Sequence, residues 1–138
     1  MNVVVWLVEG TWEACVDAAR ELPGPVVLLH VVGPDTTDAV AGARAGLLGR
    51  ATQPPGADPF AAVQAAILDA AQARLGRPAV RMARRGRPEW EVLATCGSGD
   101  LLVVARDGDR TRPGPHNLGP ATRFVVDHAP CRVLLVWP

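Results

Sequence analysis

Two segments near the end of the chain, DLLVVARDG (100–108) and LGPATRFVVDHAPCRVLLV (118–136), decide the fold. The first is an apolar run that ends at a loop. The second begins with Gly and Pro, continues as a helical pattern and ends in another apolar run. This order is typical of a β-α-β unit, whose two strands run parallel. The intervening loop, rich in Gly, Pro and Arg, lies where α/β proteins usually bind phosphate.

The same alternation extends over the whole chain. Most of the apolar runs are nearly continuous, as expected for strands that helices cover on both faces. The run at 79–84 contains Arg81 and Arg84 and is predicted to be an edge strand. We therefore predict an α/β fold with a parallel sheet and right-handed crossovers. The predicted strands are 2–8, 25–32, 79–84, 100–105 and 132–137.

Helical patterns fill the connections between these runs. Thr11 is predicted to cap a helix after the first strand. Asp58, which a proline follows, and Gly76 are the start and stop signals of a longer helix. Two shorter helices are predicted to begin at Pro88 and near Pro120.

The connection at residues 33–57 is longer than a usual link. We predict a helix through 38–48 and a Pro/Gly loop at 49–57. The chain has no internal repeat, and its Pro/Gly clusters are read as internal loops. Residues 1–138 are therefore predicted to form a single domain.

The composition is that of a globular domain. Hydrophobic residues make up 49% of the 138 residues, and 14 basic residues balance 14 acidic ones. A net charge of zero argues against a general attraction to nucleic acid or to acidic lipid. The apolar runs are too short to cross a membrane, and the start, MNVVVWLVEG, lacks the features of a signal peptide.

Three cysteines, Cys15, Cys96 and Cys131, lie far apart in the sequence and form no CxxC pair. This spacing argues against a metal cage or a disulfide framework and fits a reducing compartment, so a cytoplasmic location is predicted. The sequence also contains no GxSxG or HExxH motif and no cluster of His, Cys and Asp. No catalytic or metal-binding residue is predicted.

Several motifs along the chain recur together in one family of α/β proteins. They are VVVWLVEGTWEA (3–14), VVLLHVV (26–32), RRGRPEWEVL (84–93) and the two segments quoted first. Their order and spacing resemble the universal stress protein family over nearly the whole chain. The resemblance implies a five-stranded parallel sheet of order 3-2-1-4-5 with helices on both faces, the adenine nucleotide alpha hydrolase-like fold. Many members bind ATP or AMP, with Mg²⁺ for a triphosphate, where strands 1 and 4 separate, and others bind no nucleotide.

The resemblance also assigns candidate nucleotide contacts. Glu9 stands where the family has an acidic residue near the ribose, but it also suits the dipole of the helix that follows. The segment around Val31 matches the one that contacts adenine through its backbone, and His30 is interpreted as a core residue. The candidate cofactor-binding residues are Val8, Glu9, Gly10, Thr11, Val31, Val104, Ala105, Arg106, Gly108, Gly119, Pro120, Ala121 and Thr122.

The phosphate loop departs from the family pattern, G-x2-G-x9-G-(S/T), at three points. Ala105 replaces the first glycine, Pro120 replaces the hydroxyl residue, and one extra residue precedes Gly119. A methyl group restricts the backbone at the first point, and proline offers neither a hydroxyl nor an N–H group. Losing two or three hydrogen bonds, at about 1 kcal/mol each, predicts ATP binding weakened about tenfold to a hundredfold or more.

Some phosphate-binding groups remain near the last helix. Ala121 and Thr122 keep N–H groups, and Thr122 also has a hydroxyl. Five basic or titratable side chains are expected around the helix start. They either replace the lost donors with charge-assisted bonds or belong to a solvated loop. They are Arg106, Arg110, Arg112, His116 and Arg123.

The last apolar run suggests a partner. In the family this edge strand commonly pairs with its copy in a second subunit, and an apolar edge left bare would favour aggregation. Trp137 is either an interface anchor or packed within its own subunit. The expected homodimer interface is Arg132, Val133, Leu134, Leu135, Val136 and Trp137.

Three functions follow from these observations. The favoured one is a homodimeric regulatory or binding module of the stress response, with weak or absent ATP binding. The first alternative is an ATP- or AMP-binding protein that uses the cleft between strands 1 and 4. The second is a small α/β enzyme whose arginines bind an anionic substrate.

Overall fold

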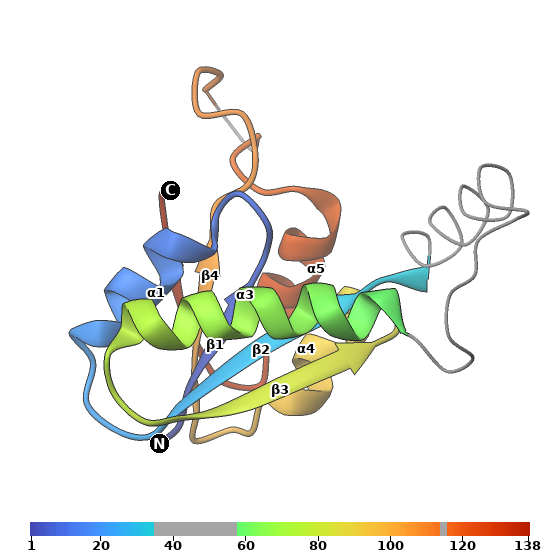
Figure 1. Ribbon diagram of the computed structural model, residues 1–138. Coiled ribbons are helices and arrows are strands. Elements are labelled where there is room, and N and C mark those ends of the chain that lie inside the picture. Colours follow the sequence, from blue (N-terminus) through green and yellow to red (C-terminus); the bar gives the residue numbers. More distant parts are fainter. Residues whose placement is uncertain (35–57, 114–115) are drawn as a thin grey trace, which may run out of the picture.

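The computed structural model describes residues 1–34, 58–113 and 116–138, and it shows a three-layer α/β domain (Figure 1). Its five strands form one parallel sheet in the order β3-β2-β1-β4-β5. The predicted fold class is confirmed. The elements are β1 (Val3–Leu7), α1 (Trp12–Arg20), β2 (Val26–Val32), α3 (Pro59–Leu75), β3 (Ala79–Arg85), α4 (Pro88–Thr95), β4 (Leu101–Ala105), α5 (Pro120–His128) and β5 (Arg132–Val136).

The helices cover the sheet on both faces, α1 and α3 on one and α4 and α5 on the other (Figure 1). Every residue of β1 is buried, because this central strand has a strand on each side and helices above and below. Alternate residues of β1 therefore belong to two separate clusters. Val3, Val5 and Leu7 pack with α1 and α3, while Val4 and Trp6 pack with α4 and α5. This arrangement explains the continuous apolar runs of the sequence.

The residues predicted to start and end the described helices are confirmed, with one exception. The Asp58 carboxylate accepts hydrogen bonds from two N–H groups at the start of α3, and Gly76 ends that helix at a φ of 70°. Pro88 and Pro120 begin α4 and α5 as predicted. Thr11 occupies the N-cap position of α1, but its side chain caps no N–H group. Its hydroxyl donates instead to the carbonyl of Val8, at 3.5 Å.

The strand bounds differ from the predicted ones by one residue at several ends, which is the usual uncertainty of a boundary. The helix predicted through 38–48 and the loop at 49–57 lie outside the described residues. Within the described ranges, no helix is long and apolar enough to cross a membrane.

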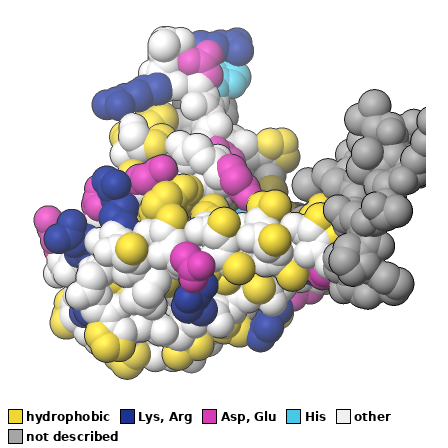
Figure 2. All heavy atoms as spheres, viewed as in Figure 1, with side chains coloured by type: hydrophobic (Ala, Val, Ile, Leu, Met, Phe, Trp, Pro, Cys, Tyr) yellow, Lys and Arg dark blue, Asp and Glu magenta, His cyan; other side chains and the backbone are white. Residues whose placement is uncertain are grey.

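The face that carries α1 and α3 has acidic, basic and apolar side chains interspersed (Figure 2). One ion pair joins the two helices there, between the Arg74 guanidinium and the Asp17 carboxylate, with a nitrogen–oxygen distance of 2.8 Å. The hydrogen bond from Arg74 lowers the pKa of Asp17. Because both side chains are nearly half exposed, water screens this attraction and the core remains the main source of stability.

The two edge strands differ in character. β3 is the edge strand that its arginines predicted, and most of its side chains are exposed. Arg81 pairs with Asp69, and Arg85 pairs with Asp58. β5, at the other edge, carries half-buried apolar residues from Val133 to Val136. Charged side chains on an edge discourage pairing with another chain, and an apolar edge does not.

Candidate functional site

A cleft of about 690 Å³ lies beyond the carboxyl ends of the central strands. One wall comes from the end of β1 and the residues after it, including Val8 and Glu9. The opposite walls come from Val31 and the turn that follows β2, from the start of α4, and from the start of α5. This is the place where β1 and β4 are neighbours while their connections leave in opposite directions, the usual ligand position in a doubly wound sheet.

The Asp107 carboxylate lies at the N-terminus of α5. One oxygen, Oδ1, accepts a hydrogen bond from the Gly119 N–H group at 2.7 Å. The other, Oδ2, accepts one from the Thr122 hydroxyl at 2.8 Å. A helix N-terminus attracts negative charge, because its N–H groups are unpaired and its dipole is positive there. Asp107 is therefore an internal anion, bound by groups that would otherwise be free to contact a phosphate.

Gly119 allows this close contact. A Cβ atom at position 119 would lie 3.0 Å from Oδ2 of Asp107, which is tighter than an ordinary van der Waals contact. In this chain, the third glycine of the phosphate pattern thus allows a carboxylate of the same subunit to come close to the start of α5. Thr122 is 97% buried, and its hydroxyl is satisfied by the hydrogen bond to Asp107.

The loop between β4 and α5 rises beyond the end of the sheet (Figure 1). Its two arms are joined by backbone hydrogen bonds, from the Gly108 N–H group to the carbonyl of Asn117 at 3.1 Å and from Asp109 to His116 at 2.7 Å. A side chain at 108 would overlap the carbonyl of His116. Gly108 is therefore explained by the close approach of the two arms of the loop.

The arginines of this loop lie elsewhere than expected. The guanidinium carbons of Arg106 and Arg110 are 5.3 and 5.2 Å from the centre of the Trp137 ring, so both side chains contact that ring rather than the start of α5. Arg112 is exposed. Among the described residues that line the cleft, Arg87 at the start of α4 is the one arginine, and it pairs with Glu89 at 3.1 Å. The expected group of basic residues around the α5 start is not formed by Arg106 and Arg110.

Glu9 and His30 form a pair at the side of the cleft. The Nε2 atom of His30 is 2.8 Å from a carboxylate oxygen of Glu9, and because a carboxylate only accepts, Nε2 is the donor. The His30 side chain is buried and the Glu9 side chain is 66% exposed. The interpretation of His30 as a core residue is confirmed. Glu9 is held by this histidine, a contact that neither sequence interpretation of Glu9 included.

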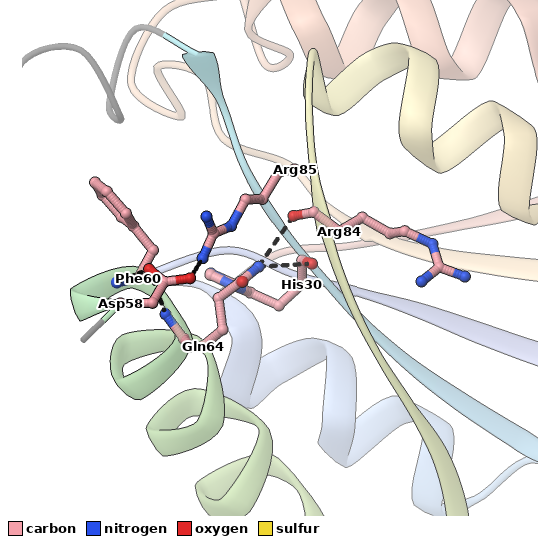
Figure 3. Close-up of polar contacts among 7 residues, drawn as sticks. His30, Asp58, Phe60, Gln64, Arg84 and Arg85 are labelled. Atoms are coloured by element: carbon pink, nitrogen blue, oxygen red, sulfur yellow. Dashed lines mark hydrogen bonds and ion pairs between the residues drawn. The ribbon is translucent and has the colours of Figure 1, made fainter. Parts of the chain in front are cut away.

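A smaller, mainly apolar pocket of about 240 Å³ adjoins the cleft between the end of β2 and the start of α3. Figure 3 shows the polar contacts beside it. The Gln64 side-chain amide donates to the carbonyls of His30 at 3.3 Å and of Arg84 at 3.0 Å. Arg85 pairs with Asp58 and lies over the ring of Phe60. These contacts hold the first turns of α3 against β2 and β3.

The structure brings together only part of the predicted nucleotide site. Val8, Glu9, Val31, Ala121 and Thr122 line the cleft. The other candidates belong to the same loops and strand ends but do not line the cleft. They are Gly10, Thr11, Val104, Ala105, Arg106, Gly108, Gly119 and Pro120. Asp107, which the sequence interpretation missed, does line it. The available signal was an acidic residue two positions after a strand, in the loop that leads to a helix N-terminus.

Comparisons with known proteins agree with the fold described above. The sequence profile of the universal stress protein family matches residues 9–136. A search of curated proteins found no match. Similar solved structures include the hypothetical protein MJ0577 (16% identity, 99% of this chain and 96% of that chain, TM-score 0.67) and the universal stress protein UspA from Lactobacillus plantarum (17%, 99% and 97%, TM-score 0.62). The hypothetical protein PH0823 is similar too (16%, 99% and 95%, TM-score 0.61). At these identities the structural likeness shows the fold.

Proposed function

The chain belongs to the universal stress protein family, and we propose that it is a homodimeric binding and regulatory module of the stress response that binds ATP weakly or not at all. One observation carries the nucleotide part of this proposal. The Asp107 carboxylate is hydrogen-bonded to Gly119 and Thr122 at the start of α5, at the end of the cleft where a phosphate chain would need those donors.

An incoming phosphate would have to displace this carboxylate. It would then recover two donors, but it would meet the negative charge of the displaced Asp107 within a few ångströms. The sequence adds a second obstacle, because the methyl group of Ala105 restricts the backbone where the family has glycine, and Pro120 offers neither a hydroxyl nor an N–H group. The Asp107 carboxylate and the two replacements in the loop are both expected to weaken ATP binding.

Titration of the purified protein with ATP and Mg²⁺ tests this part of the proposal. We expect no saturable binding below about 1 mM, a Kd that corresponds to about −4 kcal/mol of binding free energy. Isothermal titration calorimetry measures it directly. Micromolar affinity would refute the proposal, as would co-purification of the protein with an adenine nucleotide.

Nucleotide binding is the second candidate function, and the size of the cleft favours it. A volume of about 690 Å³ lies within the range of small-molecule sites. Such a function requires Asp107 to leave the α5 start, which the same titration would reveal. An enzyme that binds an anionic substrate through the loop arginines has less support, because Arg106 and Arg110 contact Trp137.

The homodimer is proposed from the contrast between the two sheet edges. Among the residues that the structure describes, β5 pairs with β4 alone, so one side of its backbone is available to a second strand. The half-buried side chains from Val133 to Val136 would become buried if two β5 edges met across a two-fold axis. Trp137 directly follows β5, and the guanidinium groups of Arg106 and Arg110 lie over its ring. These three side chains form a broad surface beside the β5 edge.

Replacing Leu135 with arginine should convert the dimer into a monomer, because the substitution places like charges opposite each other in a two-fold interface. Sedimentation velocity at micromolar protein measures the change, and circular dichroism checks that the variant is folded. Val80→Arg places the same charge on the opposite edge strand, where Val80 is exposed, whereas Leu135 is partly buried against the core, so the check of folding applies to both variants. A wild-type protein that sediments as a monomer, or an equal effect of both variants, would contradict the proposed interface.

We also propose that the module acts in the cytoplasm. All three cysteines are free thiols, as expected in a reducing compartment. The zero net charge gives no general attraction to nucleic acid or membrane surfaces. The expected partner is therefore a second copy of the chain, with a nucleotide as a possible ligand, rather than a nucleic acid or a membrane.

A further inference from the structure

Two of the three cysteines are neighbours, although 35 positions separate them in the sequence. Cys96 is the C-cap residue of α4 and is buried. Cys131 directly precedes β5, is partly exposed, and packs against the core cluster that contains Cys96. The Cys131 thiol is close enough to the Cys96 thiol to contribute to the raised pKa of Cys96.

Backbone contacts fix this arrangement. The parallel pairing of β4 with β5 sets Leu101 beside Arg132, so the residues just before them, Asp100 and Cys131, come together at the same end of the sheet. A tight turn joins Cys96 to that point. In it, the Asp100 N–H group donates to the carbonyl of Gly97 at 3.0 Å, and the Asp100 carboxylate accepts from the Gly97 N–H group at 2.8 Å. The strand pairing and this turn thus hold the backbones of Cys96 and Cys131 at the same end of the sheet.

The two thiols differ in accessibility. Burial, followed by the neighbouring Cys131 thiol and Asp100, raises the pKa of Cys96 to about 12, so Cys96 keeps its proton at neutral pH. Cys131 is the more exposed of the pair and meets a dissolved oxidant first. Cys15 provides an internal comparison. It is fully buried in the cluster on the other face of the sheet, and burial raises its pKa to about 12.

We propose that Cys96 and Cys131 are a redox modification site, at which hydrogen peroxide produces an intramolecular disulfide. The Cys131 thiolate attacks one peroxide oxygen, the O–O bond breaks, and the products are a sulfenic acid and, after protonation, water. The Cys96 sulfur then attacks the Cys131 sulfur. The S–O bond breaks, the Cys96 proton leaves with the departing hydroxide as a second water, and the S–S bond forms. Two thiols are oxidised by two electrons and one peroxide is reduced to two waters.

The bond would join the end of α4 to the start of β5, the strand proposed to pair with a second subunit. A disulfide in a reducing compartment is usually transient, so the bond is expected to form under oxidative stress and to be reversed by thiol reductants. This inference does not depend on whether the cleft binds a nucleotide.

Peptide mapping of the full chain tests it. The protein is treated with hydrogen peroxide, its remaining thiols are alkylated, and it is digested with trypsin without reduction. We expect the peptides 86–106 and 124–132, which contain Cys96 and Cys131, to appear as one cross-linked species that lacks two hydrogen atoms. The species should disappear after dithiothreitol. The peptide 1–20, which contains Cys15, should remain unoxidised.

Three variants complete the test. Cys15→Ala should leave the cross-link unchanged. Cys131→Ser should abolish it and leave Cys96 as a free thiol, and Cys96→Ala should leave Cys131 as a sulfenic or further oxidised acid. In the wild-type protein, a disulfide between two subunits through Cys131 as the main product would overturn the proposal. So would over-oxidation of Cys131 while Cys96 remains alkylatable.

Discussion

Replacing Asp107 with alanine should tighten ATP binding about tenfold to a hundredfold. The carboxylate competes with a phosphate for Gly119 and Thr122, and hydrogen bonds to charged groups contribute about 1.5–3 kcal/mol each. Asp107 is exposed, so water compensates for part of that amount. The net gain on removing the side chain, together with its charge, is therefore expected near 1.4–2.8 kcal/mol, which is the stated range of affinity.

Calorimetric titration with ATP and Mg²⁺ measures the change, and adenosine serves as the second ligand. Because adenosine carries no phosphate, its affinity should be the same in the wild-type protein and in the Asp107→Ala variant. The ATP affinity of the Asp107→Asn variant should lie between those of the wild type and of Asp107→Ala, because the amide carries no negative charge but still offers one oxygen to the start of α5. This series separates electrostatic competition from a general change in the shape of the cleft.

Asp109→Ala is the matched control in the same loop. The Asp109 carboxylate is exposed and accepts hydrogen bonds from the hydroxyl and the N–H group of Thr111, which lower its pKa. It touches neither Gly119 nor Thr122, so its removal should leave ATP binding unchanged. If both variants bind ATP as weakly as the wild type, Asp107 is not the obstacle. If Asp107→Ala binds more weakly than the wild type, the carboxylate assists the ligand, and the proposal is wrong.

The second large effect is expected on folding. Replacing Gln64 with alanine should lower the free energy of unfolding by about 2–4 kcal/mol, because two carbonyl groups lose their donor in a buried place and a cavity remains. Gln64 is 97% buried, and its amide donates to His30 on β2 and Arg84 on β3 (Figure 3). Urea denaturation, with the midpoint shifted at an unchanged slope, measures the loss.

Two further variants show which part of the loss is due to hydrogen bonding. Gln64→Met keeps most of the side-chain volume and removes only the amide, so it should retain at least half of the effect. Gln72→Ala removes one comparable amide from the same helix, which donates to the carbonyl of Arg77 but is only partly buried. It should cost about 0.5–1.5 kcal/mol. If Gln64→Ala and Gln72→Ala lower the free energy of unfolding equally, the hydrogen bonds of Gln64 to β2 and β3 contribute no more to stability than the single bond of Gln72.

Most of the fold could be predicted from the sequence because its signals are local. The continuous apolar runs, Asp58 at the start of α3 and Gly76 at its end each act over a few residues. The order of the strands came from the family resemblance, because a run of valines does not specify its neighbour. The strand bounds were less well predicted, since hydrogen bonding at strand ends depends on the adjacent strand.

The candidate site was predicted less well, because its contacts join residues that are distant in the sequence. The family pattern directed attention to Ala105 and Pro120, while the carboxylate that occupies the α5 start belongs to Asp107, between two positions of the pattern. The pair of Glu9 with His30 and the proximity of Cys96 to Cys131 depend on which strands lie side by side. No spacing rule in the sequence reports such a contact.

The difference between β3 and β5 has a consequence for how far an assembly can grow. If two subunits join through their β5 strands, both apolar edges are used, and the outer ends of the combined sheet are the two arginine-bearing β3 strands. Neither end offers a template for a third subunit. A continuous sheet would therefore stop at ten strands instead of polymerising into a fibre, so that stoichiometry is limited by the chemistry of the outermost strands.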